Sequence, residues 1–225
     1  MLTALALALT IQSPVHNTLT PTEAHAGWKL LFDGKTTAGW RNFKSKSISD
    51  GWKVEDGALT IADASKAGDI VSEGTYDWFE LSLEANIGKG QNSGIMFRVV
   101  DEGEAPWHSG PEIQLYDHPR QDGVETTGYL YQLYQPAPGI DAAKPAGEWN
   151  QLRIVLSPEK CESYVNGVKY FEFAYGGEDF WARVKKSKFS KFPGFAKAER
   201  GHIAIQGDHG LVKFRNIKIR SIKKP

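Results

Sequence analysis

The chain has 225 residues, of which 40% are hydrophobic and 24% are charged. This composition is sufficient for a buried core and excludes an intrinsically disordered chain. Its 27 basic residues balance its 27 acidic residues, so no long-range field draws the protein to nucleic acid or to an anionic membrane. The single cysteine, Cys161, excludes an internal disulfide and a cysteine-based zinc site, and we expect it to be a small buried or half-buried residue.

The N-terminal segment begins with an apolar run at residues 2–11 that is too short to span a bilayer. The run resembles the hydrophobic region of a secretory signal, although no Lys or Arg precedes it. We therefore expect residues 1–17 to be a leader that is cleaved between Ala8 and Asn17, and the protein to be exported to the periplasm or the cell exterior. Residues 18–225 are expected to form one domain, because no linker or repeat divides them.

The expected domain begins with a short helix. Thr20 is followed by Pro21 at the first helical position and by Glu23 three residues after the Thr, which is the pattern of a capping box. This pattern predicts a helix over residues 21–26.

Most of the chain after this helix alternates apolar and polar residues with a period of two, which indicates antiparallel strands. The longest such run places Phe79, Leu81, Leu83, Ala85 and Ile87 on one face. Shorter runs of the same kind lie at residues 95–100, 112–116, 151–156 and 203–206.

Turn residues support this interpretation. Asn166-Gly167 lies between two strand-like runs and predicts a two-residue hairpin turn. In the last strand the apolar phase shifts between Phe214 and Ile217, which predicts a bulge near Arg215-Asn216. Many short strands separated by turns predict an all-β sandwich of two antiparallel sheets. The basic, aromatic segment 175–200 is expected to fold as a loop over a sheet edge, with one or two helical turns at most.

The segment Glu112–His118 is the most informative for function. If Ile113 and Leu115 point into the core, Glu112 and Gln114 share the opposite face, about 7 Å apart along the strand. A bulge at the strand end would bring Asp117 to the same face. Such a face is either a solvated surface or the lining of a concave sugar-binding groove.

Residues elsewhere in the chain favour the groove. Arg98 is expected to point away from its apolar neighbours, and Asn92 lies at the start of a strand where Gly94 permits close approach. Tyr131 offers an aromatic face of the kind that lines sugar pockets. His209 lies in a Gly-Asp-His-Gly turn after Gln206, and this turn is either a plain loop or part of the site.

The spacing of these polar residues can be compared with that of retaining glucanases built on a similar sandwich. Those enzymes carry Glu-x-Asp-x-x-Glu on one strand, whereas this chain has Glu112-x-Gln114-x-x-Asp117. Double displacement needs two carboxyl groups about 5–5.5 Å apart, and Gln114 cannot titrate. The substitution argues against that mechanism.

Seven motifs then appear in order: GWKLLFDGKTTAGW, NSGIMFR, EIQLYDH, TGYLYQLY, GEWNQLRI, the Asn-Gly hairpin and IAIQGDHGLVKFRNIKI. Together they resemble the 3-keto-disaccharide hydrolase family over about residues 27–221. The resemblance implies a concanavalin A-like jelly-roll β-sandwich, and export is common among members of that family.

The resemblance also implies a reaction, the hydrolysis of glycosides already oxidised at C3. A ketone at C3 acidifies the C2 hydrogen, so the group on C1 can leave by elimination and water can then add. This chemistry needs one base and a stabiliser of the enediolate, not a carboxylate pair. On this basis Glu112 or His209 is expected to be the base, Arg98 an electrostatic stabiliser, and Asp117 an orienting carboxylate or a metal ligand. The expected sugar-binding residues are Asn92, Gln114, Tyr131, Trp149 and Gln206.

The sequence leaves two other functions open. One is a non-catalytic carbohydrate-binding module on the same scaffold, because a fold does not fix a function. The other is a classical β-glucanase, which Gln114 disfavours. In each case the expected partner is a carbohydrate, not nucleic acid or a membrane. No cofactor is identifiable, although Glu112 and Asp117 are hard oxygen donors of the kind that bind divalent cations. The oligomeric state is not predicted.

Overall fold

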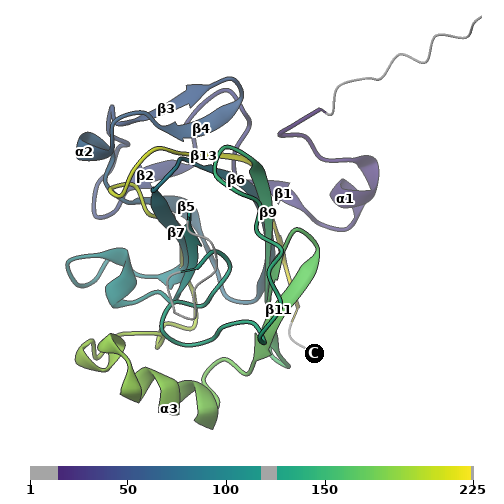
Figure 1. The fold of residues 1–225 in the computed structure, drawn as a ribbon. Helices are drawn as coiled ribbons and strands as arrows, with labels where there is room; N and C mark the ends of the chain where they lie inside the picture. The colour runs from purple at the N-terminus through teal and green to yellow at the C-terminus, as the bar shows by residue number, and fades with distance from the viewer. Residues whose placement is uncertain (1–14, 118–125, 224–225) are drawn as a thin grey trace, which may run out of the picture.

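The computed structural model describes residues 15–117 and 126–223. Within these residues two antiparallel sheets face each other across an apolar core (Figure 1). One sheet has eight strands in the order β11-β10-β9-β6-β13-β4-β3, with β1 paired to β13, and the other has five in the order β2-β5-β12-β7-β8. The predicted two-sheet sandwich is confirmed.

The elements follow one another along the chain as α1 (Pro21–His25), β1 (Lys29–Leu30), β2 (Trp40–Asn42), β3 (Trp52–Glu55), β4 (Ala58–Ile61), α2 (Ala64–Ala67), β5 (Ile70–Tyr76), β6 (Phe79–Ile87), β7 (Asn92–Val99), η1 (Pro106–His108), β8 (Glu112–Tyr116), β9 (Trp149–Leu156), β10 (Cys161–Val165), β11 (Val168–Phe173), α3 (Glu178–Lys186), η2 (Lys188–Lys191), β12 (Gly201–Ile205) and β13 (Val212–Ser221). No helix among the described residues is long and apolar enough to cross a membrane.

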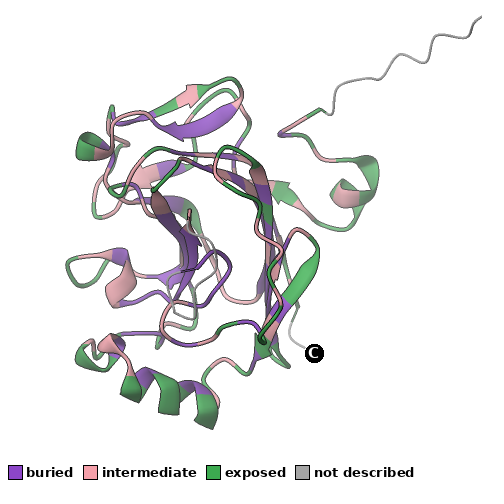
Figure 2. Cartoon of the chain, viewed as in Figure 1, coloured by how far each residue is buried: buried purple, intermediate pink, exposed green. Residues whose placement is uncertain are grey.

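The core forms where the period-two pattern predicts it. The alternate apolar residues of β6, β8 and β9 are buried between the sheets, and so are Ile203 and Ile205 of β12. Figure 2 shows the strands of both sheets as largely buried, whereas α1 and much of α3 are exposed. Cys161 is free and fully buried, as expected.

The helix cap, the hairpin turn and the bulge predicted from the sequence are also present. The Thr20 side chain accepts a hydrogen bond from the Glu23 N–H, and the Glu23 side chain accepts one from the Thr20 N–H, which completes the capping box of α1. Asn166 and Gly167 both have positive φ, as a two-residue hairpin turn requires. In β13 the register shifts between Arg215 and Lys218, so the predicted bulge is confirmed.

The segment 175–200 is more helical than predicted. The nine-residue helix α3 and the 3-10 helix η2 lie below the two sheets in Figure 1. Phe180 and Val184, four residues apart, share one face of α3 and join the core. Asp179 and Arg183 pair one turn apart on the helix. Because only two positions face the core, the apolar pattern is too short to distinguish this helix from a loop by sequence.

Candidate functional site

The candidate site lies on the outer face of the five-stranded sheet. Because Ile113 and Leu115 of β8 point into the core, Glu112 and Gln114 point outward. A cavity of about 470 Å³ opens over them, which we call the Glu112 pocket. It is lined by Asp69, Asn92, Ala105, Trp107, Glu112, Gln114, Tyr116, Tyr131, Lys188, Gln206, Asp208 and His209.

Glu112 is the most unusual residue of this pocket. Its side chain lies directly over Gly94 of the neighbouring strand, where a Cβ would overlap the carboxylate. The residue is only 6% exposed, and its Oε1 has no hydrogen-bond partner among the described residues. Burial raises the pKa of Glu112 to about 7, partly offset by the positive charge of Lys188. A carboxyl group in this state can accept or donate a proton near neutral pH.

Asp69 is a second carboxyl group in the pocket, and it is not among the site residues predicted from the sequence. It lies directly before β5, and its Oδ1 accepts a hydrogen bond from the Gly207 N–H at 3.0 Å. Burial raises the pKa of Asp69 to about 6, against the opposing effect of that hydrogen bond. The available signal was an acidic residue between Gly68 and the apolar start of a strand.

His209 lies at the rim of the same pocket. Its Nδ1 is hydrogen-bonded to the Asp208 carboxylate beside it, and its side chain is 45% exposed. The structure therefore brings Glu112 and His209, the two candidates for the base, to one cavity. Their burial differs, because Glu112 lies on the floor and His209 is open to solvent.

One wall of the pocket combines aromatic rings with a cation. The Nζ atom of Lys188 lies 4.5 Å from the ring centre of Trp107 and 4.6 Å from that of Tyr131. Lys188 comes from η2, in the segment that was predicted to be a loop over a sheet edge with one or two helical turns at most. The clustering of basic and aromatic residues in that segment was the available signal, but the sequence does not show which lysine faces the site.

Four of the five expected sugar-binding residues line the pocket: Asn92, Gln114, Tyr131 and Gln206. The Gln206 carbonyl accepts a hydrogen bond from Ser93 Oγ at 2.7 Å, which holds the end of β12 against β7. Amide side chains next to aromatic rings are the usual lining of a site that binds sugar hydroxyls and ring faces.

Arg98 was expected to point away from the core toward the site, and this prediction is wrong. Arg98 has a positive φ of 55°, and the pairing of β7 with β12 shifts register next to it. This bulge turns the side chain to the inner side, where the guanidinium lies between the rings of Trp78 and Tyr175. It donates two hydrogen bonds to the Asp77 carbonyl. Arg98 is therefore a structural residue at the sheet's end and does not line the pocket.

Trp149 was expected to bind sugar, but it does not line the Glu112 pocket either. It lies in β9 of the eight-stranded sheet, where Leu152 and Ile154 face the core and the odd-numbered residues face outward. Its ring lies against the guanidinium of Arg215 on that sheet's outer face, 3.9 Å away. The Glu112 pocket is on the outer face of the other sheet.

Asp117 does not join Glu112 in the pocket. Its Oδ2 accepts a hydrogen bond from the Gly90 N–H at 2.8 Å, which ties the end of β8 to the loop before β7. In residues 15–117 and 126–223 no group of three or more His, Cys, Asp or Glu residues is arranged to hold a metal ion. His118 lies outside the described residues.

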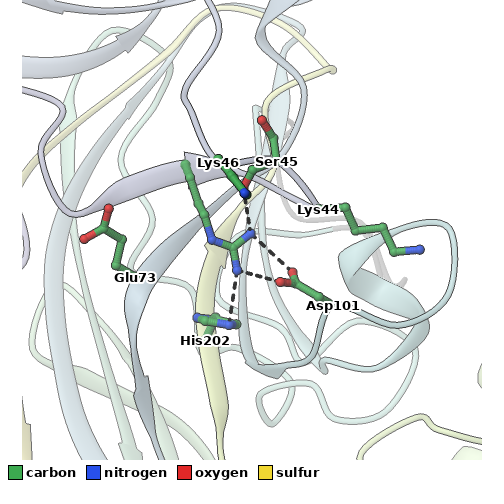
Figure 3. A pocket seen from close by; sticks show the side chains of 7 residues that line it. Lys44, Ser45, Lys46, Glu73, Asp101 and His202 are labelled. Carbon is green, nitrogen blue, oxygen red and sulfur yellow. Dashed lines mark hydrogen bonds and ion pairs between the residues drawn. The ribbon is translucent and has the colours of Figure 1, made fainter.

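A second depression lies on the same outer face, and we call it the Arg41 depression (Figure 3). It is lined by Arg41, Lys44, Ser45, Lys46, Glu73, Asp101 and His202. Here Arg41 is paired: its Nη2 lies 2.6 Å from Asp101 and 3.4 Å from His202 Nε2. A buried apolar cluster of Val71, Met96, Val99 and Ala204, with Phe43 and Trp107 packed on it, also lies on this face.

Comparison with known proteins extends this description. A family model for the 3-keto-alpha-glucoside-1,2-lyase-like domain matches residues 27–220. A protein of Bacteroides thetaiotaomicron named 3-keto-disaccharide hydrolase is 30% identical over 227 residues, covering 86% of this chain and 78% of the relative. The crystal structure of a candidate glycosyl hydrolase of Parabacteroides distasonis matches with a TM-score of 0.85 at 30% identity, over 93% of this chain and 100% of that one.

A more distant structure confirms the fold. A non-specific endo-β-1,3(4)-glucanase of glycoside hydrolase family 16 aligns with a TM-score of 0.50 over 88% of this chain and 95% of its own. At 17% identity this similarity shows only the shared jelly-roll sandwich.

The sandwich, its polar outer pocket and these matches define the class of protein: it is an enzyme of the glycoside hydrolase type. The family follows from the model that covers residues 27–220, which is most of the chain. The chain belongs to the 3-keto-alpha-glucoside-1,2-lyase-like domain family, and the family resemblance drawn from the seven motifs is confirmed.

Proposed function

We propose that this enzyme cleaves small glycosides whose sugar is already oxidised to a ketone at C3, and that Glu112 is the base. The observation that carries the proposal is the buried carboxylate of Glu112, which has no hydrogen-bond partner among the described residues and lies on the floor of a polar pocket. Leaving such a group unsatisfied is costly, and enzymes accept this cost where the group reacts.

The reaction is an elimination followed by a hydration. Glu112 removes the C2 proton, the C2–H electron pair forms a C2=C3 double bond, and the carbonyl pair moves to O3. When the C3 carbonyl re-forms, the electrons shift to a C1=C2 double bond and the C1–O bond breaks, releasing the alcohol after it gains a proton. Water then adds its hydroxyl to C1 and a proton to C2, so the sum is hydrolysis.

The pocket supports this chemistry more than double displacement. A single base suffices for elimination, and Gln114 occupies the position where a glucanase strand carries an acid. Asn92, Gln114 and Gln206 would bind hydroxyl groups, and Trp107 and Tyr131 would contact a ring face. His209, at the solvent side, would protonate the leaving oxygen or orient the attacking water.

The description of the family and the name of one relative are consistent with the same route. The family model is described as lyase-like, and the Bacteroides relative is named a hydrolase. Elimination across C1 and C2 is a lyase step, and the hydration that follows makes the overall reaction a hydrolysis. One active site that performs both steps accounts for both names.

The test compares a 3-keto-disaccharide with its unoxidised parent. We expect release of the second sugar from the oxidised substrate only. In D₂O the product should gain deuterium at C2, because the C2 proton is removed and then replaced from solvent. This incorporation should be faster than in an enzyme-free control. Release from the parent disaccharide would contradict the proposal, and binding without release would identify a carbohydrate-binding module.

A further inference from the structure

The proposed reaction needs a positive group that the expected residues do not supply. Removal of the C2 proton moves negative charge onto O3, and catalysis depends on stabilising that charge in the transition state. Arg98, the residue expected in this role, lies on the inner side of the sheet and does not line the pocket. Among the described residues that line the Glu112 pocket, Lys188 is the only lysine or arginine.

We propose that Lys188 is the catalytic residue that stabilises the enolate oxygen. The proposal rests on the proposed function, because it assigns a role within that reaction. In the step itself, Glu112 takes the C2 proton while the ammonium of Lys188 donates a hydrogen bond to O3, and the ammonium keeps all its protons throughout.

The fold positions both the backbone and the side-chain ammonium of Lys188. Its backbone N–H donates a hydrogen bond to Gln132 Oε1 at 2.9 Å, and Ser187 caps the 3-10 helix η2 that Lys188 begins. Its Nζ lies over the rings of Trp107 and Tyr131 at 4.5 and 4.6 Å. Aromatic faces attract a cation without cancelling its charge, so these two rings position the ammonium at the wall of the pocket.

The charges around Glu112 are consistent with this role. Asp69 and Asp208 line the pocket near the ends of β5 and β12 and raise the pKa of Glu112, whereas Lys188 lowers it. His209, hydrogen-bonded to Asp208, and the phenols of Tyr116 and Tyr131 are further titratable groups in the pocket lining. Lys188 therefore favours ionisation of Glu112. During the reaction its positive charge stabilises the negative charge that develops on O3 when Glu112 removes the C2 proton.

The test replaces Lys188 by Met, Gln or Arg, with Lys191→Met as the matched control on the exposed end of the same 3-10 helix. We expect Lys188→Met and Lys188→Gln to lower kcat on the 3-keto-disaccharide on the order of 10²- to 10³-fold, and Lys188→Arg to restore much of it. The acid limb of the kcat/KM profile should also move to higher pH in the Met and Gln variants, because Glu112 loses a nearby cation. Lys191→Met should match wild type in both measurements.

Two results would overturn the inference. One is a kcat within about threefold of wild type in both neutral variants, since an oxyanion-stabilising group is worth far more. The other is a lower kcat with an unmoved acid limb and no rescue by Arg, which would indicate a purely structural residue. Failure of the proposed function is separate: wild type would then release nothing from the 3-keto-disaccharide, whatever residue stands at position 188.

Discussion

The two depressions on the outer face of the five-stranded sheet differ in whether their most buried charged group has a partner. In the Arg41 depression the guanidinium is paired with Asp101 and contacts His202, whose Nδ1 lies 2.6 Å from the Ser72 carbonyl. In the Glu112 pocket a carboxylate oxygen is buried over Gly94 with no partner in the described part of the chain. Both depressions are polar, but among the described residues only the second has a buried side-chain oxygen without a hydrogen-bond partner.

This difference shows why polarity alone does not identify a site. Charged groups that pair with one another contribute to the fold, and their hydrogen-bonding capacity is largely used, so they bind a ligand less strongly. A buried carboxyl group without a hydrogen-bond partner costs stability, and such costs cluster at sites where a ligand or a reaction uses the group. The pocket with the raised carboxyl pKa values is therefore the place where chemistry is expected.

The largest effect is expected for Glu112→Gln, which keeps the shape of the side chain and removes the base. Release from a 3-keto-disaccharide should slow at least about a hundredfold. Steady-state assays measure this, with a sugar-binding measurement to show that the pocket remains intact. If Glu112→Gln keeps near full activity while His209→Ala is inactive, the two roles are exchanged.

The same substitution should stabilise the folded protein at neutral and alkaline pH. The pKa of Glu112 rises from 4.5 to about 7 on folding, so stability falls as pH rises from about 4.5 to 7 and stays lower above that. Glu112→Gln removes this loss, which corresponds to about 3 kcal/mol at most. Urea unfolding at pH 5 and pH 8 measures it. A variant less stable than wild type at pH 8 would contradict the assignment.

An intermediate effect is expected for Gly94→Ala, which tests the position of the carboxylate. A Cβ there would overlap the Glu112 side chain and displace it. We expect kcat to fall roughly tenfold to a hundredfold, since small misplacements of a reacting group are costly. Gly194→Ala is the control, because nothing lies within 4 Å of a Cβ at that position. Equal activity of the two variants would show that Glu112 does not need its present position.

A smaller effect is expected for His209→Ala. Because His209 is partly exposed at the rim, water can replace part of its function. We expect a loss of roughly tenfold in kcat, at or below the low end of acid–base contributions. The loss should shrink for a substrate whose leaving group is a more acidic alcohol, and a loss that is independent of the leaving group would argue against proton donation.

The smallest effect on catalysis is expected in the Arg41 depression. Asp101→Asn breaks the ion pair with Arg41, and because the Asp101 side chain is 41% exposed, the loss of stability should be about 1 kcal/mol or less. Thermal unfolding measures this loss, and kcat should remain that of wild type. A large fall in kcat would show that the two depressions act as one site.

The sequence predicted the strands and the floor of the pocket because both depend on a period of two. That alternation places Ile113 inside and Glu112 outside, and it needs no knowledge of the partner strands. It fails at Arg98, where a residue with positive φ reverses the direction of the side chain. Nothing in the local sequence marks that bulge.

The rest of the pocket depends on contacts between distant segments. Asp69 and Lys188 line the same pocket as Glu112 only because β5 and β8 belong to one sheet and Lys188 of η2 reaches that face. The prediction for Trp149 is wrong for the same reason. The alternation correctly places Trp149 on the outer face of its strand, but that strand belongs to the other sheet. Residue spacing predicts the face of a strand, whereas the assignment of a strand to a sheet requires the tertiary fold.

The proposed role of Glu112 depends on the ionisation of its carboxyl group, which can be measured directly. A titration of the glutamate side-chain carboxyl carbons by ¹³C NMR, with Glu112→Gln used to assign the signal, gives the pKa in the intact enzyme. We predict a midpoint of about 7, caused by burial on the pocket floor. A midpoint near the ordinary value of 4.5 would mean that this carboxylate is solvated, and would contradict the central claim.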